Sequence, residues 1–285
     1  MNQTATAIVF PGQGSQEEGM RDDVERERPD LLEAVVEAVG EDPFPRVGEG
    51  TRFDQPAIFC AGLAGYERLG RPTPELFAGH SLGELTALTA AGVLTEKDAV
   101  GLVAARGRAT DDAAAAAGGG MLVLKAGRDQ AAEIAEGSGL AVANDNAPQQ
   151  VVLSGDDQAL EAGERVAGDA GVRAMRLPVA GAFHSPLMQP AVAPFEEALE
   201  AVEIAEGTAP VYSCVTCAPF DDVPKRLAEA LVSPVRWLEV MQALHAAGAR
   251  RFVEPGPGSA LSGMVRRSLE DVEVEGPEPP EAAGA

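Results

Sequence analysis

Short apolar runs alternate along the chain with longer segments whose apolar residues recur at helical spacing. The runs rich in apolar and β-branched residues predict buried strands, and the periodic segments predict amphipathic helices. The predicted strands are residues 4–10, 76–79, 121–124, 140–143, 150–154, 172–177, 210–215 and 251–254. The predicted helices are residues 30–39, 55–69, 82–88, 96–106, 129–136, 156–170, 193–202, 223–232, 236–247 and 258–269. This alternation favours an α/β fold with a mainly parallel sheet that helices cover on both faces.

The middle of the chain has a pattern of its own. Residues 113–120 read Ala-Ala-Ala-Ala-Ala-Gly-Gly-Gly, which predicts the end of a helix followed by a hinge. The elements after it follow the order βαββαβ, with a turn over residues 144–148, and this order is typical of a ferredoxin-like unit. We therefore predict a large catalytic domain from residues 1–117 and 183–274, a small ferredoxin-like subdomain over 118–182, and a disordered acidic tail over 275–285.

Residues 79–83 read Gly-His-Ser-Leu-Gly and follow a predicted strand. This is the G-x-S-x-G pattern of a nucleophile elbow, a sharp strand-to-helix turn that exposes its serine. The two glycines fit because a Cβ on either side of so tight a turn would clash. Ser81 is therefore the candidate nucleophile, and it needs a base to activate it.

The chain offers only three histidines as that base. His80 lies inside the turn, where its side chain should point away from the serine, and His245 lies in a predicted helix. We expect structural roles for both. His184 lies in a loop between a strand end and Pro186, which suits a poised imidazole. Because no acidic residue stands out near it in the sequence, a backbone carbonyl could orient the ring in a Ser–His dyad.

Composition narrows the class of function further. A net charge of −23 disfavours nucleic acid and anionic membrane surfaces as partners. Only three cysteines are present, so we expect no disulfide framework and a cytoplasmic location. Cys214 and Cys217 are too few for a zinc site, and we interpret them as packing residues. The first residues lack the basic and apolar regions of a signal peptide, and no apolar run is long enough to span a membrane.

Several separated segments together resemble one family, the malonyl-CoA:acyl-carrier-protein transacylases of fatty-acid synthesis and the related acyltransferase domains of polyketide synthases. They run in the family's order from residue 7 to about residue 268. The stronger matches are Phe-Pro-Gly-Gln-Gly-Ser-Gln at 10–16, Gly-His-Ser-Leu-Gly-Glu at 79–84, Arg-Gly at 106–107 and Gly-Ala-Phe-His-Ser-Pro-Leu-Met at 181–188. The weaker ones are residues 54–57, 144–146, 233–237 and 254–258.

The resemblance implies a role for each site residue. Ser81 would carry the acyl ester and His184 would act as the base. The backbone N–H groups of Gln13 and Leu82 would form the oxyanion hole. Arg106 would hold the malonyl carboxylate, since a guanidinium can grip a carboxylate with two hydrogen bonds. The family often has glutamine where this chain has Ala230, and the carbonyl of Ala230 could still orient the histidine.

The resemblance also implies an α/β-hydrolase-like core and a monomer without metal or other cofactor. Its substrates would be malonyl-CoA and an acyl carrier protein, the latter docked on a basic patch of arginines 173, 176, 266 and 267. We predict ping-pong transfer of malonyl through Ser81 to the carrier's phosphopantetheine thiol. One alternative is a serine hydrolase or editing thioesterase, against which Arg106 argues. Another is a non-catalytic carrier-binding module that has kept the fold.

Overall fold

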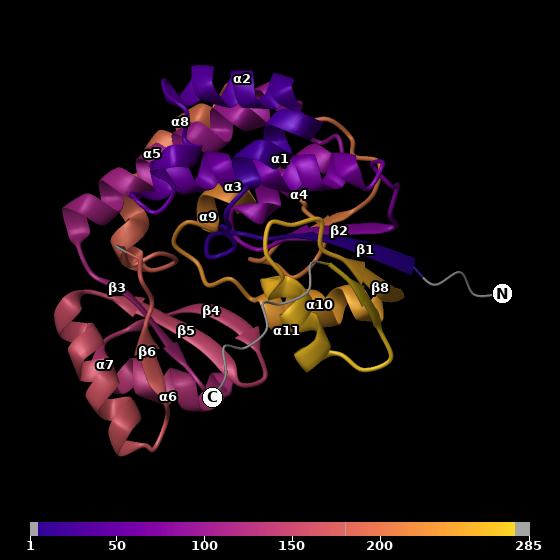
Figure 1. The fold of residues 1–285 in the computed structure, drawn as a ribbon. Coiled ribbons are helices and arrows are strands. Elements are labelled where there is room, and N and C mark those ends of the chain that lie inside the picture. Colours follow the sequence, from indigo (N-terminus) through magenta and orange to yellow (C-terminus); the bar gives the residue numbers. More distant parts are fainter. Residues whose placement is uncertain (1–4, 180, 277–285) are drawn as a thin grey trace.

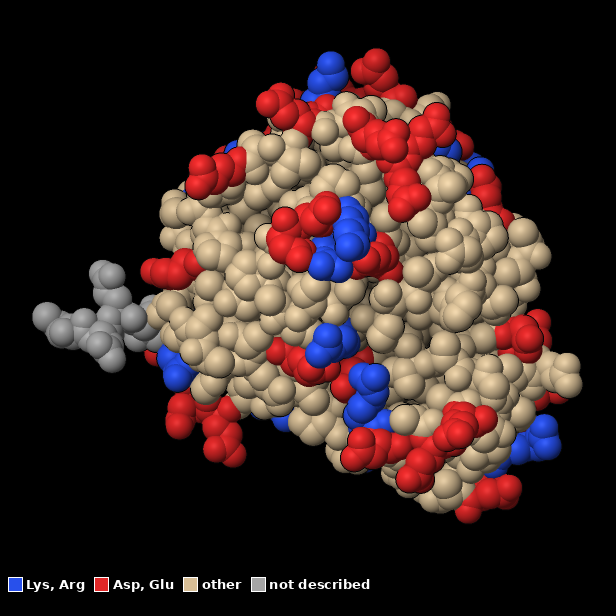
Figure 2. Space-filling model, turned by 180° about the vertical axis from the view of Figure 1, so that it is seen from behind, with Lys and Arg blue, Asp and Glu red and all other residues tan. Residues whose placement is uncertain are grey.

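The computed structural model describes residues 5–179 and 181–276, which form a mixed α/β fold around two separate sheets (Figure 1). Residues from both ends of the chain build the larger sheet, and a continuous middle segment builds the smaller one. None of the helices in the described ranges is long and apolar enough to cross a membrane. Acidic side chains are scattered over the face seen in Figure 2, in several places beside lysine or arginine.

The larger sheet is parallel, with strand order β7-β2-β1-β8-β9. Its strands are β1 (Ala5–Phe10), β2 (Leu76–Gly79), β7 (Val211–Tyr212), β8 (Ala249–Val253) and β9 (Glu273–Glu275). Alternate residues of central strand β1 enter two different apolar clusters: Ile8 and Phe10 join one, and Ala7 and Val9 join the other. Both faces of the strand are therefore buried, as expected for a parallel sheet between helices.

Helices cover these two faces unequally. The first cluster packs against α1 (Met20–Glu27), α2 (Pro29–Val39), α3 (Thr51–Arg68), α4 (Gly83–Ala90), α5 (Glu96–Ala117), α8 (Val192–Glu200) and α9 (Val223–Glu229). The second packs against α10 (Trp237–Ala246) and α11 (Ala260–Ser268). Two 3-10 turns complete the described elements, η1 (Phe44–Arg46) and η2 (Pro186–Ala191). Phe10 pairs with Gly79 where β1 and β2 end, so the loops after both strands meet at one edge of the sheet.

The smaller sheet is antiparallel, with strand order β4-β5-β3-β6. It comprises β3 (Gly120–Leu124), β4 (Ala141–Ala147), β5 (Gln150–Gly155) and β6 (Ala174–Arg176), with helices α6 (Arg128–Ser138) and α7 (Asp157–Asp169). The two helices pack on one face. Met121, Ala143 and Val152 lie on the other face, where Phe183 packs against them.

A short bridge of hydrogen bonds joins the two parts. The N–H of Asp145 donates to the carbonyl of Val235, and the N–H of Val235 donates to the carbonyl of Ala143, both at 2.9 Å. Strand β4 therefore pairs with the loop that precedes α10 as well as with β5.

Three local expectations from the sequence were wrong. Residues 144–147 continue strand β4 instead of forming a turn, because Val235 supplies backbone partners that a local pattern cannot reveal. Residues 273–275 form strand β9, so the predicted tail starts too early; residues 277–285 lie outside the described residues. The helix predicted over 55–69 begins at Thr51.

Candidate active site

The nucleophile elbow links β2 to α4. Ser81 has a φ of 54°, in the left-handed region that side-chain-bearing residues rarely adopt. A Cβ on Gly79 would overlap the backbone of Gly83, and a Cβ on Gly83 would overlap the carbonyl of Phe10. The turn thus packs backbone against backbone at both glycines, and this tight packing accommodates the strained serine.

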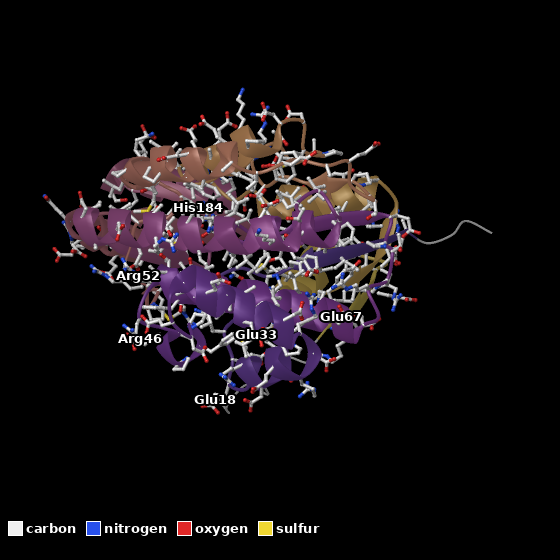
Figure 3. The ribbon with its side chains drawn as sticks, turned by 90° about the horizontal axis from the view of Figure 1, so that it is seen from above. Glu18, Glu33, Arg46, Arg52, Glu67 and His184 are labelled. Carbon is white, nitrogen blue, oxygen red and sulfur yellow. The ribbon has the colours of Figure 1, made fainter. Side chains whose placement is uncertain are left out.

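His184 lies beside that serine, although 103 positions separate them in the sequence. Its Nε2 is 2.8 Å from Ser81 Oγ, and its Nδ1 is 2.8 Å from the carbonyl oxygen of Ala230 and 3.2 Å from that of Ser233. Because carbonyl oxygens only accept, we assign the ring proton to Nδ1. The lone pair of Nε2 then faces the hydroxyl. Figure 3 shows His184 next to the long helix α5, with Glu18 and Glu33 toward the outer edge of the helical layer.

The environment of the imidazole keeps it neutral. Burial, reinforced by the positive charge of Arg106, lowers the pKa of His184 to about 3, while the carbonyl of Ala230 opposes this shift. A neutral imidazole is the form that can accept a proton from a serine hydroxyl.

Arg106 reaches the same hydroxyl from α5. Its Nη2 donates to Ser81 Oγ at 3.1 Å, and its Nη1 donates to Gln55 Oε1 at 2.7 Å. The residue is only 4% exposed, and burial lowers the pKa of its guanidinium to about 10. At neutral pH it is therefore a buried cation on a helix, next to the candidate nucleophile.

The predicted oxyanion-hole donors lie on the two loops that meet at the sheet edge. Leu82 follows Ser81 directly, and Gln13 belongs to the loop after β1. That loop lies close to the elbow, since a Cβ on Gly12 would overlap the carbonyl of His80. Among the described residues, neither the N–H of Gln13 nor that of Leu82 is paired with a protein acceptor. Their role in binding a ligand oxygen stays a prediction.

The other two histidines take separate positions. His80 Nε2 lies 2.8 Å from Asn146 Oδ1, and its ring packs edge-on against Trp237 at 5.5 Å between centroids. This contact ties the elbow to strand β4. His245 lies on α10 and is not among the residues that line the cleft over Ser81, which is described below.

Neither cysteine of the 214–217 segment joins a metal cluster. Cys214 is buried, and its thiol donates to the carbonyl of Gly79 at 3.2 Å. No group of three or more potential metal ligands occurs within residues 5–179 and 181–276.

The sequence pattern gave no role to two buried polar residues at the site. Gln55 is fully buried and contacts Arg106. Glu84, in the first turn of α4, accepts a hydrogen bond from the N–H of Cys214 at 2.7 Å, and burial raises its pKa to about 7. Both residues fall within the matched segments, at 54–57 and 79–84. That position was the only sequence signal for them.

A cleft of about 870 Å³ lies over these groups, between the edge of the larger sheet and the smaller sheet. Ser81, His184 and Arg106 line it together with apolar side chains from both parts, including Val123 and Met264. Its volume lies in the range of small-molecule binding sites, and its lining combines apolar side chains with a few polar groups.

The fold and the site define an α/β protein with a serine–histidine pair at a cleft between two sheets. A family model described as the acyl transferase domain matches residues 34–280. The chain therefore belongs to the acyl transferase domain family.

Its relatives match over nearly the whole chain. The malonyl CoA-acyl carrier protein transacylase of Bacillus subtilis is 37% identical over 97% of this chain and 95% of its own length. The crystal structure of malonyl-CoA:acyl carrier protein transacylase from Xanthomonas oryzae superposes with a TM-score of 0.89 at 34% identity, covering 98% of this chain and 96% of that one. The acyltransferase domain from the second module of the salinomycin polyketide synthase has a TM-score of 0.86 at 33% identity, covering 96% and 69%.

Proposed function

We propose that this protein transfers a malonyl group from malonyl-CoA to the thiol of an acyl carrier protein, through an ester on Ser81. One observation carries the proposal. The Ser81 hydroxyl lies between a neutral imidazole at 2.8 Å and a buried guanidinium at 3.1 Å. The first group can activate the serine, and the second can select an acyl group that ends in a carboxylate.

In the first half-reaction, Ser81 Oγ attacks the thioester carbonyl carbon while its proton passes to His184 Nε2. Negative charge develops on the carbonyl oxygen, where the N–H groups of Gln13 and Leu82 stabilise it. The C–S bond then breaks, and the proton on Nε2 passes to the departing CoA sulfur. The carbonyls of Ala230 and Ser233 keep the ring in one tautomer throughout.

The second half-reaction repeats these steps in reverse. The carrier's thiol gives its proton to His184 Nε2 and attacks the seryl ester, and the Ser81 oxygen recovers the proton as it leaves. Arg106 holds the substrate carboxylate in both steps, so the same geometry positions the acyl group twice. No step requires a metal or other cofactor.

Arg106 favours this reaction over plain ester or thioester hydrolysis. A pocket for uncharged acyl chains gains nothing from a buried cation without a carboxylate partner, because desolvating that cation is costly. The finer architecture belongs to the same proposal: an α/β-hydrolase-like core and a ferredoxin-like subdomain that together form the cleft.

For the carrier, the arginines on α11 are better placed than Arg176. Arg176 forms ion pairs with Glu164 and Asp157. Arg267 instead donates to Gln150, which lines the cleft, and α11 contributes Leu261 to the same lining. We place the docking patch at this end of the cleft.

The experiment is to follow radiolabelled malonyl from malonyl-CoA in the presence of a carrier protein. The proposal expects label on Ser81 and then on the carrier, and no transfer by Ser81→Ala. Free malonate without labelled carrier would instead identify a hydrolase. A Ser81→Ala variant equal to the parent in every assay would identify a binding module.

A further inference from the structure

The hydrogen-bond partners of the buried Arg106 guanidinium are neutral. Its two described hydrogen bonds go to the amide oxygen of Gln55 and the hydroxyl of Ser81. Many arginines elsewhere in the chain are paired with carboxylates; Arg28, for example, contacts Asp30 and Glu96. No described carboxylate lies within ion-pair distance of Arg106; the charge of the buried Glu84 acts on the guanidinium from farther away, and burial raises the pKa of that carboxyl to about 7.

Gln55 has only one possible amide orientation at this position. Arginine can only donate, so Oε1 must face Arg106 and Nε2 must face the other side. On that side Nε2 donates to Thr110 Oγ1 at 3.1 Å and to Gln13 Oε1 at 3.3 Å. Thr110 in turn donates to the carbonyl of Arg106, one helical turn back, at 2.8 Å. Gln55 is 0% exposed, so these protein groups are the partners that satisfy its amide.

We infer that Gln55 is a positioning residue that sets the acyl selectivity of the site, an inference that rests on the proposed function. Its amide oxygen holds the guanidinium beside Ser81 without neutralising it, so the positive charge stays available for a substrate carboxylate. Its amide nitrogen ties the same unit to Gln13, whose N–H lies in the candidate oxyanion hole. Gln55 therefore links the group that recognises the acyl end to the loop that stabilises the reacting carbonyl.

Neutrality of residue 55 is the essential property. A glutamate there has nearly the same shape, but its carboxylate would pair with Arg106 at the distance that Gln55 now occupies. A buried pair interacts strongly in a medium of low dielectric constant, so the substrate carboxylate would meet a compensated cation. The glutamate would also face Gln13 Oε1 without a proton to donate.

The test compares Gln55→Glu with the parent in competitive loading of malonyl-CoA and acetyl-CoA, read by intact mass spectrometry of the Ser81 ester. Gln242→Glu is the control, since it adds the same charge at an exposed position on α10 that does not line the cleft. We expect the malonyl-to-acetyl loading ratio to fall at least about tenfold in Gln55→Glu, with acetyl loading kept within about threefold of the parent. Gln242→Glu should keep the parental ratio.

Two results would overturn the inference while leaving the proposed function intact. One is an unchanged ratio in a Gln55→Glu variant with the parental melting temperature; the other is an equal loss of both acyl groups, which a purely structural role predicts. If Gln55→Glu does not fold, Gln55→Met at similar volume leaves the cation uncompensated but removes the hydrogen bond that positions it, so a smaller fall in the ratio is expected and an unchanged ratio would overturn the inference. Failure of the parent itself to load malonyl would reject the proposed function and this inference together.

Discussion

The carbonyl oxygen of Ala230 accepts the Nδ1 proton of His184 at 2.8 Å, so the backbone does the work that a carboxylate does in many serine–histidine sites. A carbonyl fixes the tautomer without adding a negative charge beside the imidazole. Little therefore offsets the effects of burial and of Arg106 on this ring.

The protonation of His184 should set how activity depends on pH. In the proposed mechanism the active form of His184 is the neutral one, so activity should be present above its pKa and be lost as pH falls through about 3. An ordinary histidine, with a pKa of about 6.5, would lose most of its activity by pH 5. We expect the rate of Ser81 modification by an uncharged fluorophosphonate to stay nearly constant from about pH 8 to about pH 4.5. Circular dichroism over the same range checks that the fold persists. A tenfold fall near pH 6 would contradict the assignment.

Arg106 should set the selectivity of the site for malonyl over acetyl. Arg106→Ala removes the fork proposed to hold the substrate carboxylate, and loading of malonyl should fall about 100-fold or more. Acetyl loading should persist, because acetyl has no carboxylate. Arg108→Ala is the control on the same helix: that residue is exposed and donates only to the carbonyl of Ala38. Equal selectivity in parent and Arg106→Ala would remove Arg106 from the acyl site.

Ionisation of the buried Glu84 should lower the stability of the protein as pH rises. Burial raises the pKa of this carboxyl to about 7 from an ordinary value of 4.5, so between these values the folded state keeps a proton that the unfolded state loses. Its contribution to the free energy of unfolding therefore declines as pH rises through that window. Glu84→Gln should gain on the parent by on the order of 3 kcal/mol between about pH 4.5 and pH 8, measured by urea unfolding. Parallel pH profiles for the two proteins would contradict this.

The elbow should tolerate no side chain at Gly83. Gly83→Ala places a Cβ against the carbonyl of Phe10, and we expect a loss of about 3 kcal/mol or more in the free energy of unfolding. Gly101→Ala is the control, since a Cβ at this exposed position in α5 meets no atom within 4 Å. It should stabilise the protein by about 0.5–1 kcal/mol, the usual gain for alanine over glycine inside a helix. Chemical denaturation gives the free energy of unfolding of both variants. Equal values for Gly83→Ala and Gly101→Ala would show that the elbow relaxes to accept the Cβ.

The sequence was most informative where a motif is local. Ser81 and its two glycines form one turn, so the elbow was visible before any fold was known. His184 could be chosen because only three histidines exist and the other two lay in less suitable contexts. The alternation of runs and helices likewise predicted a parallel sheet, because that pattern is local in each element.

Long-range contacts explain what the sequence could not reveal. The segment at 144–147 has the composition of a turn, yet Val235 completes its backbone pairing and makes it a strand. Gln55 is an ordinary amide in a helix, and its importance arises only when α3 packs against α5 and brings it to Arg106. The roles proposed for Gln13, Leu82 and Ala230 depend on their backbone atoms, for which residue identity carries little signal.

The bridge between strand β4 and Val235 has a consequence for protein engineering. A chimera that imports only residues 120–176 from a relative would bring a foreign partner for Val235 and a foreign neighbour for His80, because Asn146 and the β4 edge travel with the graft. The loop that contains Ala230 and Ser233 continues directly into Val235. A poor fit between the grafted strand and Val235 would therefore shift the carbonyls that hold the imidazole of His184. Recombination designs should therefore exchange the small sheet and residues 230–237 as one cassette.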